Sequence, residues 1–253
     1  MSVVPTMSGV IDRRILVNYR VDPGVLDALL PSPFRPQLVH GYGIAGICLI
    51  RLRYLRPQGL PPLVGLTTEN AAHRIAVLWD GPDGAGRGVY IPRRDSPSLL
   101  TVALGGRLFP GAHHRAAFTV DETGRRLRVG FASRDGSAHA SIDATRSVEV
   151  AADSVFGSLD EASAFFEGSP LGYSPTHRPG RFEGLELRCR RWAMAPLRIE
   201  GASSSIFESD AFPTGTAVLD SAFLMTDIPA SWHGRDPLTG TDHGARSLSG
   251  TSG

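Results

Sequence analysis

The chain has 253 residues, 42% of them hydrophobic, and a formal net charge of +1. This composition is typical of a globular protein with a buried core, and the scattered basic residues argue against nucleic acid or an anionic membrane as a partner. The N-terminal residues lack a signal-peptide pattern, and no apolar run reaches the roughly 18 residues of a membrane span, so we expect a cytoplasmic protein.

All 26 basic residues are arginine, and none is lysine. GC-rich codon usage is one explanation for this composition. Its chemical consequence holds in any case, because only a primary amine condenses with a ketone, so no side chain here can form an imine. Arginine stays protonated and is suited to bidentate carboxylate binding instead.

The N-terminal half is predicted to alternate strands with short helices. Asp22 and Pro23 supply an N-cap and a first-turn proline for a helix that Pro31 ends. A second helix is predicted to follow Asp95 or Ser96, run through residues 99–104 and end at two glycines. Hydrophobic patterns between these helices and glycine- or proline-rich turns predict strands at residues 13–19, 44–54, 66–79 and 88–91.

The C-terminal half contains the clearest local pattern, a meander of strands at residues 115–120, 125–133 and 138–144 joined by Asp- and Gly-containing turns. Ser158 and Glu161 form a capping box for a helix that Gly168 ends. Further strands are predicted at residues 185–192, 197–203 and 217–224. These elements indicate a β-dominated α+β fold, an antiparallel β-barrel with a few short helices. We expect one domain over residues 1–232 and a loose polar tail over residues 233–253.

The two cysteines, Cys48 and Cys189, lie in apolar strand-like runs. This placement favours buried, reduced thiols, with a disulfide or a nucleophile as the alternatives.

Three segments resemble acetoacetate decarboxylase. Residues 13–36 (RRILVNYRVDPGVLDALLPSPFRP) are similar to its opening strand–helix unit, and residues 66–77 (LTTENAAHRIAV) to its strand with an active-site Glu. Residues 88–118 resemble the helix and turn that lead to its catalytic lysine pair. A late segment, residues 188–201 (RCRRWAMAPLRIEG), resembles the uncharacterised bacterial branch of the acetoacetate decarboxylase-like superfamily that lacks the Schiff-base lysine.

This resemblance implies roles for a few residues. Glu69 falls at the position of the family's active-site Glu, and Arg13 or Arg14 falls near its substrate-binding Arg. The Schiff-base lysine position falls near Gly111, so the family's nucleophile is absent and its decarboxylation mechanism is excluded.

Acid/base chemistry is the function that remains open to these residues. Glu69 and His73 alternate on one predicted strand, so they share a face, roughly 13 Å apart by strand rise. They could flank a bound molecule, and His113 could replace the family's lysine in proton transfer. His113 and His114 should point to opposite sides, so at most one enters a pocket.

Arginines and aromatic residues are candidates for holding the substrate. Arg13, Arg14, Arg93 and Arg94 could clamp a carboxylate or an enolate oxygen. Tyr173 and Trp192 could line the pocket, although core packing is the ordinary role of both.

We therefore expect a lysine-independent enzyme that acts on a small keto, enol or polyketide-like substrate by cyclisation, dehydration, isomerisation or a lyase step. The alternative is a barrel that binds a small molecule without catalysis. Glu69, His73 and His113 could instead hold a metal, but their spacing matches no metal motif, so we expect no metal and no cofactor. Homo-oligomer formation is left open.

Overall fold

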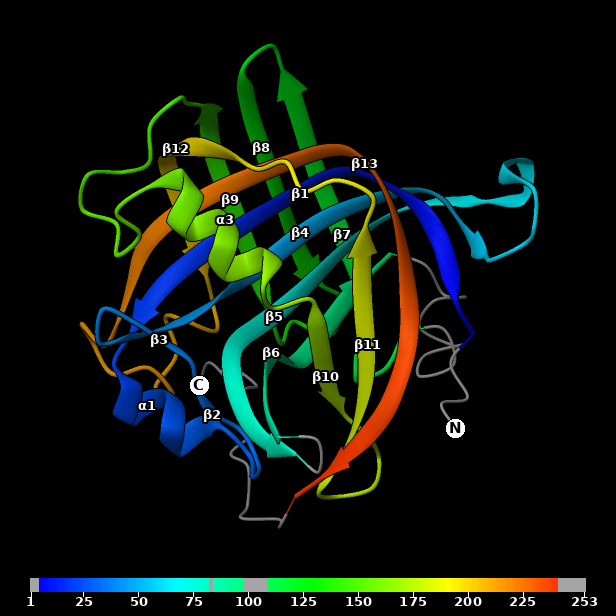
Figure 1. Ribbon diagram of the computed structural model, residues 1–253. Coiled ribbons are helices and arrows are strands. Elements are labelled where there is room, and N and C mark those ends of the chain that lie inside the picture. The colour runs from blue at the N-terminus through cyan, green and yellow to red at the C-terminus, as the bar shows by residue number, and fades with distance from the viewer. Residues whose placement is uncertain (1–4, 82–83, 98–108, 241–253) are drawn as a thin grey trace.

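The computed structural model describes residues 5–81, 84–97 and 109–240. Within them, thirteen strands form one sheet, with two α-helices and a 3-10 turn between them (Figure 1). The helices are α1 (Pro23–Leu29) and α3 (Leu159–Glu167), and the 3-10 turn is η1 (Pro62–Val64). The strands are β1 (Met7–Val21), β2 (Arg35–Pro36), β3 (Leu38–Val39), β4 (Tyr42–Pro57), β5 (Leu66–Gly81), β6 (Gly84–Ser96), β7 (His113–Thr123), β8 (Arg126–Ser133), β9 (His139–Arg146), β10 (Leu171–Pro175), β11 (Arg181–Cys189), β12 (Ala195–Ser204) and β13 (Ala217–Thr239).

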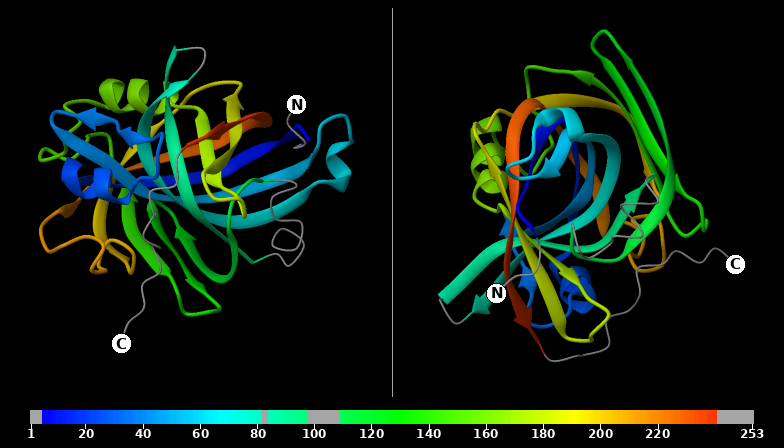
Figure 2. Two further views of the ribbon diagram at one scale, coloured as in Figure 1. Left: turned by 90° about the horizontal axis from the view of Figure 1, so that it is seen from below. Right: turned by 90° about the vertical axis from the view of Figure 1, so that its right-hand side faces the viewer.

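The sheet closes on itself in two ways. One ring runs β6–β7–β8–β9–β12–β13–β1–β4–β5 and returns to β6 through the β5–β6 ladder. A second ring shares β13, β1, β4, β5 and β6 and is closed by β10 and β11, which link β6 to β13. The strands surround a common axis in the right-hand view of Figure 2. The predicted barrel-type, β-dominated fold is therefore confirmed.

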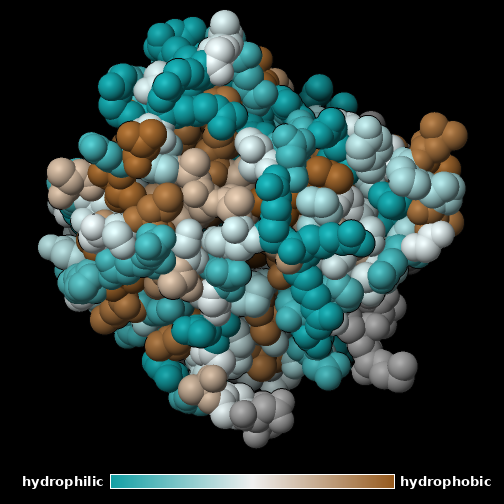
Figure 3. Space-filling view, turned by 45° about the horizontal axis from the view of Figure 1, so that its top comes forward, coloured by the Kyte–Doolittle hydropathy of each residue, from teal (hydrophilic) through white to brown (hydrophobic). Residues whose placement is uncertain are grey.

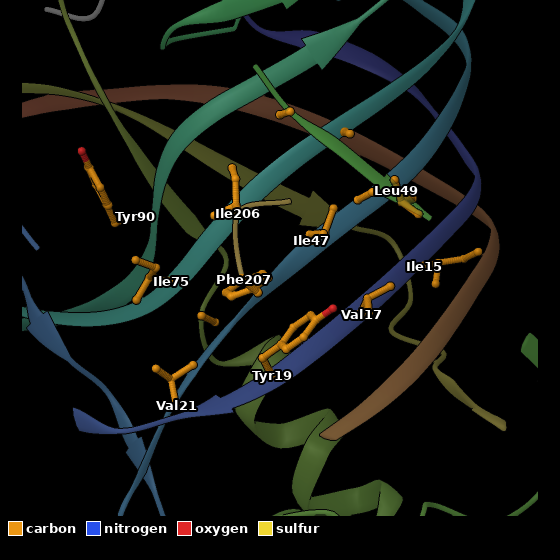
Figure 4. Packing of buried hydrophobic residues seen from close by; sticks show 14 of the residues in the cluster. Ile15, Val17, Tyr19, Val21, Ile47, Leu49, Ile75, Tyr90, Ile206 and Phe207 are labelled. Atoms are coloured by element: carbon orange, nitrogen blue, oxygen red, sulfur yellow. The ribbon is translucent and has the colours of Figure 1, made fainter. Parts of the chain in front are cut away.

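Each shared strand has two buried faces. On β1, Ile15, Val17, Tyr19 and Val21 pack into one hydrophobic cluster inside the first ring, where Figure 4 shows them beside residues of β4 and β5. Leu16, between them in sequence, packs into a different cluster on the opposite face. This alternation follows from the two-residue period of a strand, so a one-residue change of position moves a side chain from one ring to the other.

Local capping explains where the helices begin. The Asp22 carboxylate accepts a hydrogen bond from the backbone N–H of Gly24 at 2.8 Å, as predicted for α1. At α3, Ser158 Oγ accepts from the N–H of Glu161 at 3.1 Å, while the Glu161 carboxylate accepts from Gly157. Phe166 and Ala162 of α3 pack on the face of the shared strands that carries Leu16, and Figure 1 shows α3 crossing in front of β1 and β4.

The predicted strands are confirmed and most are longer than expected, but the strand predicted at residues 185–192 ends at Cys189. β10, β2 and β3 were not predicted. The sheet is not purely antiparallel, because β6 pairs in parallel with β7 and with β10. The tail boundary at His233 is wrong, since β13 continues to Thr239 along β11. The helix predicted at residues 99–104 lies outside the described residues.

The β4–β5 hairpin projects from the body of the molecule. Its end carries exposed apolar side chains, with Leu63 95% exposed, and Figure 3 shows hydrophobic residues there at the right of the view. Among the described residues, the helices are too short to cross a membrane.

Candidate functional site

A cavity of about 150 Å³ lies within the second ring. Its walls come from β1, β4, β5, β6, β7, α3, β10, β11 and β13, and most of the lining side chains are apolar. A small apolar chamber with a few polar groups is the usual form of a small-molecule site. The polar groups that line this cavity therefore define the candidate site.

Three arginines, Arg14, Arg74 and Arg94, line the cavity. Arg14 Nε donates to the Cys48 sulfur at 3.4 Å, Arg74 donates to the side-chain oxygen of Asn18, and Arg94 Nε donates to the carbonyl oxygen of Pro110 at 2.9 Å. Among the described residues, none of the three forms an ion pair with a carboxylate.

Burial makes this arrangement costly without a negative partner. Arg74 is only 4% exposed, and its Nε has no hydrogen-bond partner among the described residues. Its guanidinium lies over the Phe166 ring at 4.9 Å, a contact that compensates part of the lost hydration. Burial lowers the pKa of Arg74 and of Arg94 to about 10, so both remain protonated at neutral pH. The cavity therefore carries positive charge that a bound anion would neutralise.

His113 adds a proton-transfer group to the same cavity. Its Nε2 lies 2.8 Å from the carbonyl oxygen of Phe109, which can only accept, so Nε2 carries the proton and Nδ1 holds the lone pair. Nδ1 is buried without a partner in the described structure. Burial first, and then the positive charge of Arg94, lowers the pKa of His113 to about 4, so the imidazole is neutral at pH 7.

Trp192 and Asn70 also line the cavity. The indole N–H of Trp192 is buried and has no acceptor among the described residues, so it could donate to a ligand. Asn70 Nδ2 donates to the carbonyl oxygen of Thr68 at 3.2 Å. Asp95, which lines the same cavity, is already paired, because both its oxygens accept from Arg93 at 2.8 and 2.9 Å.

Glu69 and Arg13 lie on the other face of the shared strands. The Glu69 carboxylate accepts from Arg13 and, at 2.6 Å, from Arg51 Nε, and both arginines also bind Glu122 of β7. Arg13 is 3% exposed, so this network compensates its buried charge. The expectation that Glu69 faces the cavity is therefore corrected, and the cavity-facing neighbour on β5 is Asn70.

His73 and Tyr173 also lie outside the cavity lining. His73 is 2% exposed inside the first ring, edge-on to Phe131, and neither ring nitrogen has a partner in the described structure. Burial and the charge of Arg93 lower its pKa to about 3. Tyr173 packs in the aromatic core, and its hydroxyl donates to the carbonyl oxygen of Asp236 at 3.3 Å.

Of the predicted site residues, the structure brings Arg14, Arg94, His113 and Trp192 together around one cavity. It does not bring Glu69, His73, Arg13 or Tyr173 to it, so the alternative of a metal held by Glu69, His73 and His113 has no geometric basis. In the described residues, no group of His, Cys, Asp and Glu has a metal-binding arrangement.

Sequence reasoning missed Arg74, which is the most buried of the three cavity arginines. One signal was available, because a charged residue inside the apolar run 71–79 is unusual for a strand buried on both faces.

Comparisons with known proteins agree with this fold. The family model of DUF2071, a family of uncharacterized conserved proteins, matches residues 11–227. No curated protein matches the chain.

Among solved structures, acetoacetate decarboxylase from Legionella pneumophila is similar with a TM-score of 0.60 at 10% identity, over 95% of this chain and 89% of that one. The enduracididine biosynthesis enzyme MppR, in complex with pyruvate, gives a TM-score of 0.56 at 14% identity, over 91% and 88% of the two chains. An acetoacetate decarboxylase-like enzyme from Sphingomonas wittichii gives 0.53 at 15% identity, over 95% and 92%. The fold is thus that of the acetoacetate decarboxylase-like superfamily.

Proposed function

The chain belongs to the DUF2071 family, and within its acetoacetate decarboxylase-like fold we propose that the cavity binds a small keto acid or its enol and promotes an enolisation step without an imine. The observation that carries this proposal is the set of cavity-lining guanidinium groups of Arg14, Arg74 and Arg94, which lack a carboxylate partner among the described residues. A ligand with a carboxylate head and a short apolar body would match both the charge and the walls of the cavity.

The relative MppR supports this choice of ligand. Its structure contains pyruvate, a 2-keto acid, in a protein of the same fold. In this chain an imine to a side chain is excluded, because no residue is lysine. Electrostatic stabilisation of an enolate by cationic donors is the route that its residues support.

His113 is the proposed base. Its Nδ1 lone pair would accept a proton from the carbon next to the ketone, and the released electron pair would move to the carbonyl oxygen. Guanidinium groups and the Trp192 N–H would then donate to the enolate oxygen. Burial is the main cause of the lowered pKa of His113, and the positive charge of Arg94 is the second. A bound carboxylate would counter the charge of Arg94 and would therefore raise that pKa.

Proton exchange tests both parts of the proposal. The protein is mixed with 2-ketobutyrate in D₂O, and the loss of the C3 proton signal is followed by NMR, while binding is measured by calorimetry. We expect exchange above the buffer rate in the wild type and its loss in His113→Gln. The matched control is His114→Gln, which changes the next residue, whose Nδ1 lies 3.0 Å from the Asp135 carboxylate instead. Arg74→Gln should weaken binding at least tenfold, because it removes a charged donor worth about 1.5–3 kcal/mol.

The same experiment separates catalysis from simple binding. Binding that depends on Arg74, without any exchange, would support the alternative of a ligand-binding barrel. Failure of 2-ketobutyrate and of pyruvate to bind at millimolar concentration would contradict the proposal as a whole.

A further inference from the structure

The thiol of Cys48 lies among the guanidinium groups of the cavity. Strand register places Leu16, Cys48, Ala72 and Arg94 in one row across β1, β4, β5 and β6. Residues directly opposite each other on neighbouring strands share a face, with strands about 4.8 Å apart. Cys48 and Arg94 are therefore about 10 Å apart at Cα, and only the methyl group of Ala72 stands between them.

The other two arginines approach the same sulfur. Arg14 Nε donates to Cys48 Sγ at 3.4 Å, and Arg74 lies two residues beyond Ala72 on β5. The Nε of Arg74 is buried and has no partner among the described residues, so it is an independent donor that could bind an acceptor atom of a ligand. A carboxylate held by these groups would bring the rest of its molecule against the thiol.

We propose that Cys48 is a nucleophile that forms a thioether with carboxylate-bearing electrophiles held by Arg14, Arg74 and Arg94. The inference rests on the proposed function, since it uses the same anion-binding groups. With a 2-alkenoate, Cys48 Sγ would bond to C3, the C2–C3 π pair would move to C2, and the thiol proton would end on C2. The addition has no leaving group and needs no oxidant or reductant, and proximity would provide its rate advantage.

Cys189 is the internal control. It is half-buried on β11 and does not belong to the cavity lining. Burial raises its pKa, although the positive charge of Arg14 acts in the opposite direction. Cys48 therefore lines the cavity together with all three arginines, whereas Cys189 lies outside the lining and is influenced by Arg14.

The test uses iodoacetate and its neutral analogue iodoacetamide on the full chain, with each cysteine followed by peptide mass spectrometry. In both reactions an S–C bond forms, iodide leaves and the thiol proton passes to solvent, so only the charge of the reagent differs. We expect iodoacetate to react about tenfold faster than iodoacetamide at Cys48, since one charge-assisted hydrogen bond is worth that factor, and to show no such preference at Cys189. Arg94→Gln, or Arg14→Gln if the first variant does not fold, should reduce the iodoacetate rate at Cys48 more than the iodoacetamide rate. The ratio of the two rates should therefore fall, because loss of a nearby cation slows both reactions but removes the attraction for the carboxylate from only one.

Equal reagent preference at the two cysteines, or alkylation of Cys189 alone, would overturn the proposal. The failure of this inference is distinguishable from failure of the proposed function. If 2-ketobutyrate binds but Cys48 shows no preference for iodoacetate, only the nucleophile is rejected. If 2-ketobutyrate also does not bind, the anion-binding site is rejected with it.

Discussion

Replacing His73 by leucine should make the protein less sensitive to acid. The imidazole is 2% exposed and its pKa is lowered to about 3, mainly by burial, whereas the unfolded chain has the ordinary value of 6.5. A histidine with a lowered folded pKa contributes its full stability above the unfolded pKa, and this contribution is lost as the pH falls toward the folded value. The relevant window therefore runs from about pH 6.5 down to about pH 3.

The size of the effect follows from the two pKa values. Each pH unit within the window costs about 1.4 kcal/mol per group, so at pH 5 the wild type loses about 2 kcal/mol through His73 relative to pH 7.5. His113, with a pKa of about 4, should cost a similar amount over the same interval. The His73→Leu variant should therefore lose about 2 kcal/mol less than the wild type over this interval, while the contributions of His113 and of His233, whose pKa is also lowered by burial, remain. Its free energy of unfolding at pH 7.5 should rise by about 1 kcal/mol, since two unpaired buried nitrogens are removed.

Urea denaturation followed by circular dichroism at pH 5, 6 and 7.5, at constant ionic strength, measures these values. His139→Leu, which removes an exposed histidine of β9, is the control for loss of a histidine as such. Equal acid sensitivity in the wild type and in His73→Leu would refute the argument, because it would mean that the buried imidazole accepts a proton without cost.

Three further substitutions test the site and the fold. Glu69→Gln should lower the free energy of unfolding by about 2 kcal/mol, because it leaves the buried Arg13 with one carboxylate partner fewer. Calorimetry should show that this variant binds 2-ketobutyrate as the wild type does. Weaker binding would mean that Glu69 belongs to the site. Trp192→Phe keeps an aromatic ring but removes the indole N–H donor, so calorimetry should show 2-ketobutyrate binding weakened by about five- to tenfold. Unchanged affinity would exclude a hydrogen bond from Trp192 to the ligand. In Gly46→Ala the added Cβ would lie 2.1 Å from the carbonyl oxygen of Val17, so urea denaturation should show a free energy of unfolding about 3 kcal/mol lower, and the melting temperature should fall. A variant as stable as the wild type would show that β1 and β4 can move apart to accommodate the methyl group.

The fold was more accessible from the sequence than the site was. Strand patterns and turn residues predict most of the strands, because these signals are local. The face on which a strand residue lies depends on irregularities that are not local. β1 has a register shift between Ile11 and Arg13 in its pairing with β4, and only the paired structure shows that Arg14, rather than Arg13, faces the cavity. The same one-residue parity separates Glu69 from Asn70 on β5.

The two faces of the shared strands also bear on the lysine-free composition. Codon bias can explain why a basic residue is arginine, but it does not determine which arginines have a partner. On one face, Arg13 and Arg51 are neutralised by Glu69 and Glu122. Arg14, one residue further along β1, lies on the opposite face of the same strands, which lines the cavity. On that face, none of the described carboxylates pairs with Arg14, Arg74 or Arg94.

This contrast within one chain argues that the unpaired charge is a property of the cavity rather than of the composition. A fold that can neutralise buried arginines on one face has the means to do so on the other. Buried guanidinium groups without a carboxylate are costly, and a ligand that supplies one offsets that cost only while it is bound. Ligands with a carboxylate should therefore raise the melting temperature of the protein, whereas the corresponding neutral amides should not.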